Sequence, residues 1–224
     1  MSTSIENFVK VVYQYEQNQI LDTRPGTIAR ALGISNAAAT DMSRKLADKK
    51  LLFYEKYQEL KLTEGGKKMA LHVIRKHRLW EAFLFRVFNL SLHEIHREAE
   101  MLEHQTSDFL AEKISAYLGY PEIDPHGEPI PDEHGSMWYR SEQVLLTFAE
   151  TGRNYEITGL IGSDKEFFDF CTSNNLKIGT KLKVLNQYEK VNMTEIKTGK
   201  KKILLNRDIA NIIFITQIPP QKGT

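Results

Sequence analysis

The sequence predicts a mainly α-helical protein with a β-rich C-terminal part, and three observations support this fold class. Apolar residues recur at helical spacing through most of the first 120 residues, whereas short segments after residue 155 alternate apolar and polar residues as strands do. Two short predicted helices joined by a glycine turn, with a small hairpin after them, form a winged helix-turn-helix pattern. The 224 residues, 41% of them hydrophobic, are sufficient for one large domain or two to three small domains.

The charge is distributed unevenly along the chain. Residues 1–80 carry 14 Lys and Arg against 8 Asp and Glu, residues 81–150 carry 4 against 14, and residues 151–224 carry 12 against 7. All seven histidines lie between His72 and His134. A basic N-terminal part suits a nucleic-acid partner, and an acidic, histidine-rich middle part suits cations. The alternative is chance unevenness.

The single cysteine, Cys171, excludes a disulfide within the chain and favours a reducing cytosol. The sequence contains no apolar run of 18 residues and no signal peptide at its start. A cytoplasmic protein without a membrane partner is therefore expected.

Residues 1–63 are predicted to form a winged helix-turn-helix domain. A first helix is expected over Ile5–Asn18, because its apolar residues recur at helical spacing. Pro25 suits the start of the second helix, and Gly33 supplies the tight turn after it. Ser35 then opens the third helix, which has a polar outer face.

The third helix is predicted to enter the major groove of DNA, beside a wing with strands at Leu52–Tyr54 and Glu59–Leu62. The residues expected to meet base edges are Asn36, Ala37, Thr40 and Asp41. The residues expected to hold phosphates are Ser35, Arg44 and Lys45, with Lys56 and Tyr57 near the wing tip. Many helical proteins contain such helix pairs without binding DNA, and the wing and the basic charge favour DNA here.

Residues 64–138 are predicted to form a helical domain that carries six possible metal ligands. His77 and Glu81 are four residues apart and share one face of a long helix. The other four fall on one side of a following helix and are His96, Glu100, Glu103 and His104. Carboxylates and imidazoles without thiolates suit manganese or ferrous iron. The alternative is that these residues are surface charges on amphipathic helices.

The second ligand-bearing helix has its own start and stop signals. Asn89 ends the long helix, and Ser91 with Glu94 forms a capping box. Ser107 is expected to cap a further helix that ends at Gly119. The apolar surface around residues 80–88 exceeds what one helix pair covers, which favours a homodimer over packing within the chain.

The segment that follows is rich in proline and glycine and is predicted to be an ordered loop. Asp124 and His126 could bind a cation, but they are expected to form hydrogen bonds within this loop and are not included in the metal site. Residues 139–154 are predicted to link it to a last domain.

Residues 155–224 are predicted to form a small SH3-like barrel of five short strands around one helix. The helix is expected over Ser163–Asn175. The strands are expected at 155–163, Lys181–Leu185, Thr194–Lys197, Ile203–Leu205 and Ile212–Ile218.

Together these segments resemble the metal-dependent repressor family of the diphtheria toxin repressor and its manganese-responsive relatives. The segments that carry the resemblance are RPGTIARALGISNAAATDMSRKL, HRLWE, the run from His96 to His104, the loop DPHGEPIP and the terminal barrel. The resemblance implies a winged-helix domain, a dimerisation domain with two metal positions per subunit for Mn(II) or Fe(II), and an SH3-like domain. It also implies that the metal-loaded homodimer binds a palindromic operator in double-stranded DNA and represses metal-uptake genes.

The resemblance also implies two ligand sets. The primary set consists of Glu100, Glu103 and His104, with Asn7 at the first-helix position that supplies a further ligand. The second set consists of His77, Glu81 and His96, completed from the barrel by Asp164 or Glu166. Iron-responsive members carry a cysteine where Glu100 stands, so this chain resembles the manganese-responsive branch. That branch places an aspartate where Asn7 stands, and some members place a glutamate where Lys10 stands.

Two other classes of function remain open from the residues alone. A di-metal helical-bundle enzyme also uses carboxylates and histidines on helices, but it needs two Glu-x-x-His pairs that the ligand helices lack. The other is a winged-helix regulator that senses a small organic effector, in which the cluster of possible ligands would be merely structural. The sequence therefore favours a repressor and not an enzyme.

Overall fold

The structure is a computed structural model that describes residues 2–17, 21–137, 142–162 and 164–219. The chain divides into two compact units. The first consists of Met1–Trp80, Glu98–Tyr120 and Ile130–Met137. The second consists of Glu81–Arg97, Pro121–Pro129 and Trp138–Thr224. No helix of the described residues is long and apolar enough to cross a membrane.

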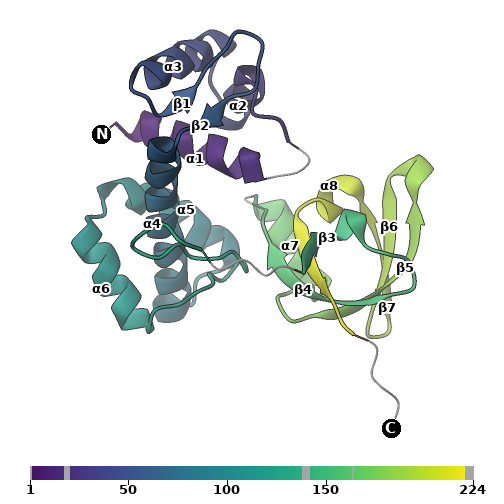
Figure 1. Cartoon of the computed structure of the whole chain (residues 1–224). Helices are drawn as coiled ribbons and strands as arrows, with labels where there is room; N and C mark the ends of the chain where they lie inside the picture. The colour runs from purple at the N-terminus through teal and green to yellow at the C-terminus, as the bar shows by residue number, and fades with distance from the viewer. Residues whose placement is uncertain (1, 18–20, 138–141, 163, 220–224) are drawn as a thin grey trace. The chain divides into compact units, whose positions relative to one another are not determined.

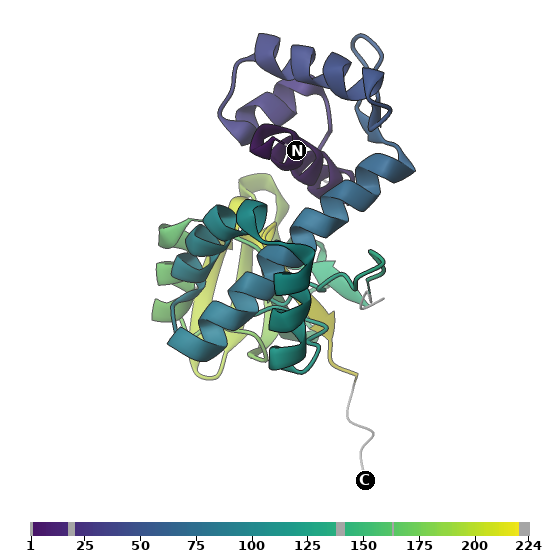
Figure 2. The ribbon, with the colours of Figure 1, turned by 90° about the vertical axis from the view of Figure 1, so that its left-hand side faces the viewer.

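The first unit begins with the predicted winged helix-turn-helix. Its elements are α1 (Thr3–Gln17), α2 (Pro25–Leu32), α3 (Asn36–Asp48), β1 (Leu52–Phe53) and β2 (Lys61–Leu62). The two short strands pair antiparallel and form the wing. These elements are the purple and blue ones at the top of the view in Figure 1, and Figure 2 shows them from a second direction.

Local sequence explains the helix-turn-helix. Gly33 ends α2 with a φ of 64°, in the left-handed region that favours glycine. Ser35 then caps α3, because its side chain accepts a hydrogen bond from the backbone N–H of Ala38. The predicted α1 is also confirmed, although its predicted end at Asn18 lies outside the described residues.

Helix α1 is part of the core of the winged helix. Phe8, Val9 and Val12 of α1 are buried, with exposed fractions of 0–1%. They belong to one hydrophobic cluster with Ile28 of α2 and Leu46 of α3. A force applied to α1 is therefore transmitted to the predicted recognition helix through close-packed side chains.

Two helices that carry the candidate ligands follow. Helix α4 (Glu64–Phe88) is long and ends before Asn89, which has a φ of 54°. Helix α5 (Leu92–Leu102) begins with the predicted capping box, in which the Glu94 carboxylate accepts from the backbone N–H of Ser91.

The chain then leaves the α-helical path sooner than predicted. Residues Glu103–Gln105 form a 3₁₀ turn, so Glu103 and His104 do not lie on α5 as expected. Ser107 caps α6 (Asp108–Leu118), and Gly119 ends it with a φ of 78°, both as predicted. The tighter turn changes the directions in which the two ligand candidates project.

The second unit contains an antiparallel sheet with the strand order β3-β8-β4-β5-β6-β7. Its strands are β3 (Gln143–Leu145), β4 (Asn154–Leu160), β5 (Lys181–Tyr188), β6 (Met193–Thr198), β7 (Lys201–Asn206) and β8 (Ile213–Gln217). Its helices are α7 (Lys165–Ser173), the short α8 (Arg207–Ala210) and the 3₁₀ turns Leu146–Phe148 and Glu189–Val191. Register shifts in β4 and β5 bend the sheet, as bulges do in small barrels.

The SH3-like fold is confirmed, with two differences in detail. Strand β3 lies within the predicted linker 139–154 and pairs with β8, so the described part of the sheet has six strands where five were predicted. Strand β3 has only three residues, too few to show the alternation of apolar and polar residues that predicts a strand. Residues 138–141, where the linker was predicted to begin, lie outside the described residues, as does Ser163, the predicted start of α7.

The loop Pro121–Pro129 packs against the sheet within the second unit. The backbone N–H of Leu160 in β4 donates to the carbonyl of His126 at 2.8 Å. Gly127 has a φ of 89°, and a Cβ placed on it would lie 2.0 Å from the carbonyl oxygen of Thr158. Only glycine allows this close approach, which fixes the loop and the direction of His126.

Candidate metal centre

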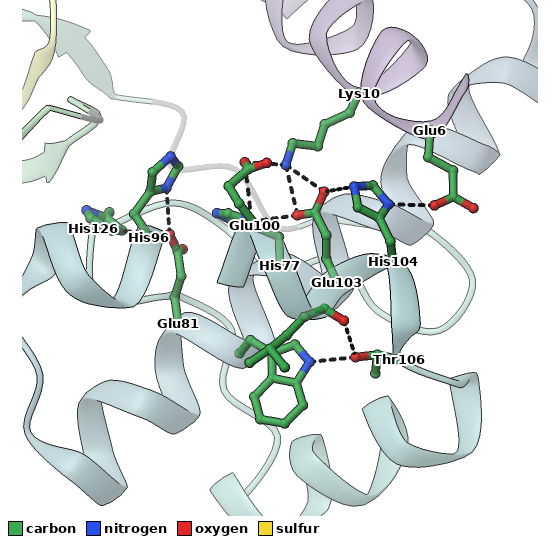
Figure 3. Close-up of polar contacts among 12 residues, drawn as sticks. Glu6, Lys10, His77, Glu81, His96, Glu100, Glu103, His104, Thr106 and His126 are labelled. Carbon is green, nitrogen blue, oxygen red and sulfur yellow. Dashed lines mark hydrogen bonds and ion pairs between the residues drawn. The ribbon is translucent and has the colours of Figure 1, made fainter. Parts of the chain in front are cut away.

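Four segments of the first unit meet around one carboxylate. The side chains that come together are Glu6 and Lys10 from α1, His77 from α4, Glu100 from α5, and Glu103 and His104 from the 3₁₀ turn. Figure 3 shows Glu103 at the centre of this group. Sequence positions almost a hundred residues apart are thus brought to a single cluster.

Glu103 makes most of the polar contacts in this cluster. It is 1% exposed, and its Oε2 lies 2.6 Å from Nδ1 of His77. Its Oε1 lies 3.1 Å from Nε2 of His104. A buried carboxylate is unfavourable unless cations or donors surround it, and both kinds of group do so here.

Lys10 brings an ammonium group into contact with this carboxylate. Its Nζ lies 2.9 and 2.8 Å from the two oxygens of Glu103 and 2.6 Å from Oε1 of Glu100. Lys10 is only 5% exposed. Some relatives carry a glutamate at this position, but here the structure places the Lys10 ammonium between the two predicted ligands Glu100 and Glu103.

His104 is held from the other side by α1. Its Nδ1 lies 2.6 Å from Oε2 of Glu6. If Nδ1 donates its proton to that carboxylate, Nε2 is the nitrogen left to bind a metal, and Nε2 is the one next to Glu103. Glu6 was not predicted as part of the site, and its position one residue before Asn7 was the one sequence feature that pointed to it.

We expect Glu6→Gln to weaken manganese binding by about tenfold or more, because groups that orient a ligating histidine contribute this much in metal sites. Calorimetric titration of both proteins with manganese measures the difference. An unchanged dissociation constant would mean that the Glu6–His104 pair only connects α1 to the turn.

The cluster has the donors that a divalent ion requires. One donor atom from each of His77, Glu100 and Glu103 lies within 4.8 Å of the others. The side-chain oxygen of Asn7 is buried and has no hydrogen-bond partner among the described residues. Imidazole and carboxylate donors, without sulfur, fit manganese or ferrous iron. His77, predicted in the second set, here contacts the primary set.

A second histidine–carboxylate group lies in the second unit. Oε1 of Glu81 is 3.1 Å from Nδ1 of His96 and 3.3 Å from Nε2 of His126. Burial acts to lower the pKa of His126, but the carboxylates of Glu81, Asp124 and Glu128 outweigh it, and the pKa is raised. Glu81 is 1% exposed, so this group too is a buried set of metal-type donors.

His126 was predicted to form hydrogen bonds within its loop, and its backbone N–H does so, donating to Oδ1 of Asp124. Its side chain also reaches outside the loop, because its Nε2 lies 3.3 Å from Oε1 of Glu81. The prediction for Asp124 is confirmed, since its Oδ1 accepts from the backbone N–H groups of His126 and Glu128. Those bonds orient the backbone so that the His126 ring is directed at Glu81. The centroid of this ring lies 5.3 Å from the centroid of the Phe168 ring. The sequence feature that could have indicated this position of His126 is the DPHG turn.

The structure does not bring Asp164 or Glu166 to this second group. Both are exposed, and Asp164 caps α7 by accepting from the backbone N–H of Phe167 at 2.9 Å. Among the described residues, no set of three clustered His, Cys, Asp or Glu ligands includes either one. Their predicted role as barrel ligands stays a prediction.

Cys171 belongs to none of the clustered ligand groups of the described residues. It is 2% exposed in the hydrophobic core of the second unit, and burial raises the pKa of its thiol to about 12. A thiol that stays protonated at neutral pH is a poor metal ligand and a poor nucleophile.

The residues predicted to contact DNA lie on the surface of the winged helix. All are exposed except Thr40, which is half-buried and bonds through its hydroxyl to the carbonyl of Asn36. Arg44 forms an exposed ion pair with Asp41 at 3.6 Å. At the wing tip, Nζ of Lys56 lies 4.9 Å from the centre of the Tyr57 ring. The outer face of α3 and the tip of the wing are therefore both accessible to a partner.

Three family descriptions match the chain in succession. Residues 1–60 match "Iron dependent repressor, N-terminal DNA binding domain". Residues 63–132 match "Iron dependent repressor, metal binding and dimerisation domain". Residues 144–217 match "FeoA domain".

Individual proteins give the same result. The chain is similar to the diphtheria toxin repressor of Corynebacterium glutamicum, with 26% identity over 223 residues, 95% of this chain and 96% of that protein. It is 31% identical to the HTH-type transcriptional regulator MntR of Bacillus subtilis over 121 residues, 54% of this chain and 84% of that protein.

Solved structures are similar over nearly the whole chain. One is described as a manganese-dependent transcriptional repressor in complex with manganese. It has a TM-score of 0.88 at 28% identity, and the match covers 96% of this chain and 100% of that chain. The crystal structure of ScaR with bound Zn2+ has a TM-score of 0.84 at 29% identity, covering 96% of this chain and 99% of that chain.

Proposed function

Since the chain belongs to the diphtheria toxin repressor family of metal-dependent transcriptional repressors, we propose that it senses Mn(II) or Fe(II) and represses metal-uptake genes. The observation that carries this proposal is the cluster of Glu100 with the buried side chains of Glu103 and His77, which shares one compact unit with the winged helix. The family consists of transcriptional repressors and not of enzymes.

The proposed primary site consists of Glu100, Glu103 and His104, with His77 beside them. Asn7 of α1, whose side-chain oxygen is buried without a hydrogen-bond partner among the described residues, is proposed as a further ligand. A bound divalent ion would supply positive charge that the carboxylates share, and would join α1 to α5 and the 3₁₀ turn. Glu6 already orients His104 from α1. A second ion per subunit is proposed at Glu81, His96 and His126, which are clustered around the Glu81 carboxylate.

The link from this site to DNA is proposed to run through α1. The same helix directs Glu6 and Lys10 at the cluster and places Phe8, Val9 and Val12 in the core beneath α3. A change in how α1 is held therefore changes how firmly the recognition helix is positioned. Binding of metal and binding of DNA are then coupled reciprocally.

A homodimer on a palindromic operator is proposed because apolar side chains remain exposed in the helical part. Those of the first unit are Met101, Phe109, Leu110, Tyr117 and Tyr120. Those near the end of α4 are Phe85, Val87 and Phe88. A two-fold dimer would bury such surfaces and present two α3 helices to successive major grooves.

The proposal is tested by selection from random-sequence duplex DNA, once with manganese or ferrous iron and once with a chelator. The metal-loaded protein should enrich a shared, palindromic sequence, and the chelated protein should not. Enrichment of the same sequence with the chelator present would contradict metal-dependent repression.

Arg44→Ala should weaken DNA binding to all sequences and reduce the slope of log affinity against log salt by about one, as expected for a lost phosphate contact. Asn36→Ala, on the same face of α3, should instead change the preference among sequences by about 1–3 kcal/mol at one position. Binding measured over a range of salt concentrations on matched and mismatched duplexes separates the two. A change of base preference in Arg44→Ala would show that this side chain reads bases.

A further inference from the structure

We propose that Lys10 is a built-in competitor for the primary metal site, and that its ammonium sets the metal concentration at which the protein responds. This inference rests on the proposed function, since it concerns the same cluster. It assigns to Lys10 a role opposite to that of a ligand. The ammonium and a divalent ion are alternative partners of the same two carboxylates.

The contacts of Lys10 describe a complete cation site. An ammonium has three N–H donors, and Nζ has three carboxylate oxygens at 2.6, 2.8 and 2.9 Å. The partners are Oε1 of Glu100 and both oxygens of Glu103. All three donors are thus used on residues that the metal site requires (Figure 3).

Burial makes this contact specific. The side chain of Lys10 is 6% exposed and that of Glu103 is 0% exposed. A lysine is almost never buried unless it is paired, and a buried pair is screened little by solvent. The arrangement is therefore unlike a surface ion pair, which contributes little and exchanges freely with solvent.

Charge and space make the two occupants exclusive. A divalent ion bound between Glu100 and Glu103 would lie where the ammonium now lies, and two cations at contact distance repel each other. Lys10 must therefore leave before the carboxylates can bind metal. The apparent metal affinity is then the intrinsic affinity multiplied by the fraction of molecules in which Lys10 has left, so a small fraction means weak apparent binding. Because Lys10 belongs to α1, its departure also changes how the winged helix is held.

The test compares manganese affinity and stability in four variants. Lys10→Met and Lys10→Gln remove the charge, Lys10→Arg retains a cation, and Lys68→Met removes one charge from an exposed position of α4 in the same unit. Manganese binding is measured by calorimetric titration. Unfolding by urea is measured with a chelator present.

We expect the two neutral variants at position 10 to bind manganese about tenfold more tightly or better, and tenfold corresponds to about 1.4 kcal/mol. The same variants should unfold at lower urea with the chelator present, because Glu100 and Glu103 lose their cation. Lys10→Arg should stay close to the original protein in both measurements, and Lys68→Met should change neither.

Tighter binding combined with lower metal-free stability is a result that a merely structural lysine would not give. Unchanged or weaker manganese binding in both neutral variants would overturn the proposal, as would an equal gain in Lys68→Met. A different result would contradict the proposed function. If the protein binds manganese without gaining affinity for DNA, the repressor mechanism is contradicted, and tighter binding by the neutral variants would still support the role of Lys10.

Discussion

Glu103→Gln is expected to lower manganese affinity by more than about 100-fold, because loss of a residue that only orients a ligand already costs about 10–100-fold. The substitution keeps the shape of the side chain and removes the charge that Lys10, His77 and His104 surround. It should also lower the free energy of unfolding of the metal-free protein by about 3 kcal/mol, the lower end for a broken buried pair, since Glu100 remains beside Lys10.

Titration calorimetry and urea unfolding measure the two effects of this substitution. Glu59→Gln is the matched control, because it removes an exposed carboxylate from the same unit. It should leave both quantities unchanged. If Glu103→Gln bound manganese as the original protein does, Glu103 would not be a ligand and the cluster would be only a structural ion-pair network.

Gly127→Ala is expected to lower the free energy of unfolding of the second unit by about 2–5 kcal/mol. Part of the effect is the left-handed backbone at a φ of 89°, and the rest is the clash of the new methyl group with the carbonyl of Thr158. The loop must then leave β4, and His126 must lose its position beside Glu81.

Gly152→Ala separates the two causes. Gly152 has nearly the same φ, 86°, but a Cβ placed on it meets no atom within 4 Å. It should therefore show only the conformational part, about 1–2 kcal/mol. Urea unfolding measures the free energy of unfolding of both variants. Equal losses in the two would show that the contact between the loop and β4 contributes nothing.

The fold was predictable because its signals are local. The helix-turn-helix depends on Gly33 and the Ser35 cap, and α5 and α6 depend on the caps at Ser91 and Ser107. Each of these residues satisfies backbone groups within a few positions along the chain. Such interactions can be read from a short stretch of sequence.

The parts that escaped prediction depend on distant contacts. Strand β3 is stabilised by pairing with β8, about seventy residues later, and its three residues are too few to show an alternating pattern. The end of α5 was misplaced because the 3₁₀ turn at Glu103–Gln105 continues a helical spacing of ligands without the helical geometry. Neither feature has a strong signal in its own segment.

The candidate site was predictable in residue type and less so in arrangement. The residues Glu100, Glu103 and His104 were predicted together, and the structure brings them together. Their partners Glu6 and Lys10 come from the other end of the unit, where nothing in α1 marks a charged residue as buried. A protonated lysine has no lone pair to offer a metal, so Lys10 does not fit the residue types that predict a metal site.

The most direct test of the central claim is the affinity for a selected operator duplex, measured against free manganese from full chelation to saturation. If the buried cluster controls the winged helix through α1, operator affinity should rise by about tenfold or more, as a coupling of 1–3 kcal/mol implies. Binding of unrelated duplexes should change much less over the same range. Equal operator affinity at zero and saturating manganese would contradict the coupling between the metal centre and the DNA-binding surface.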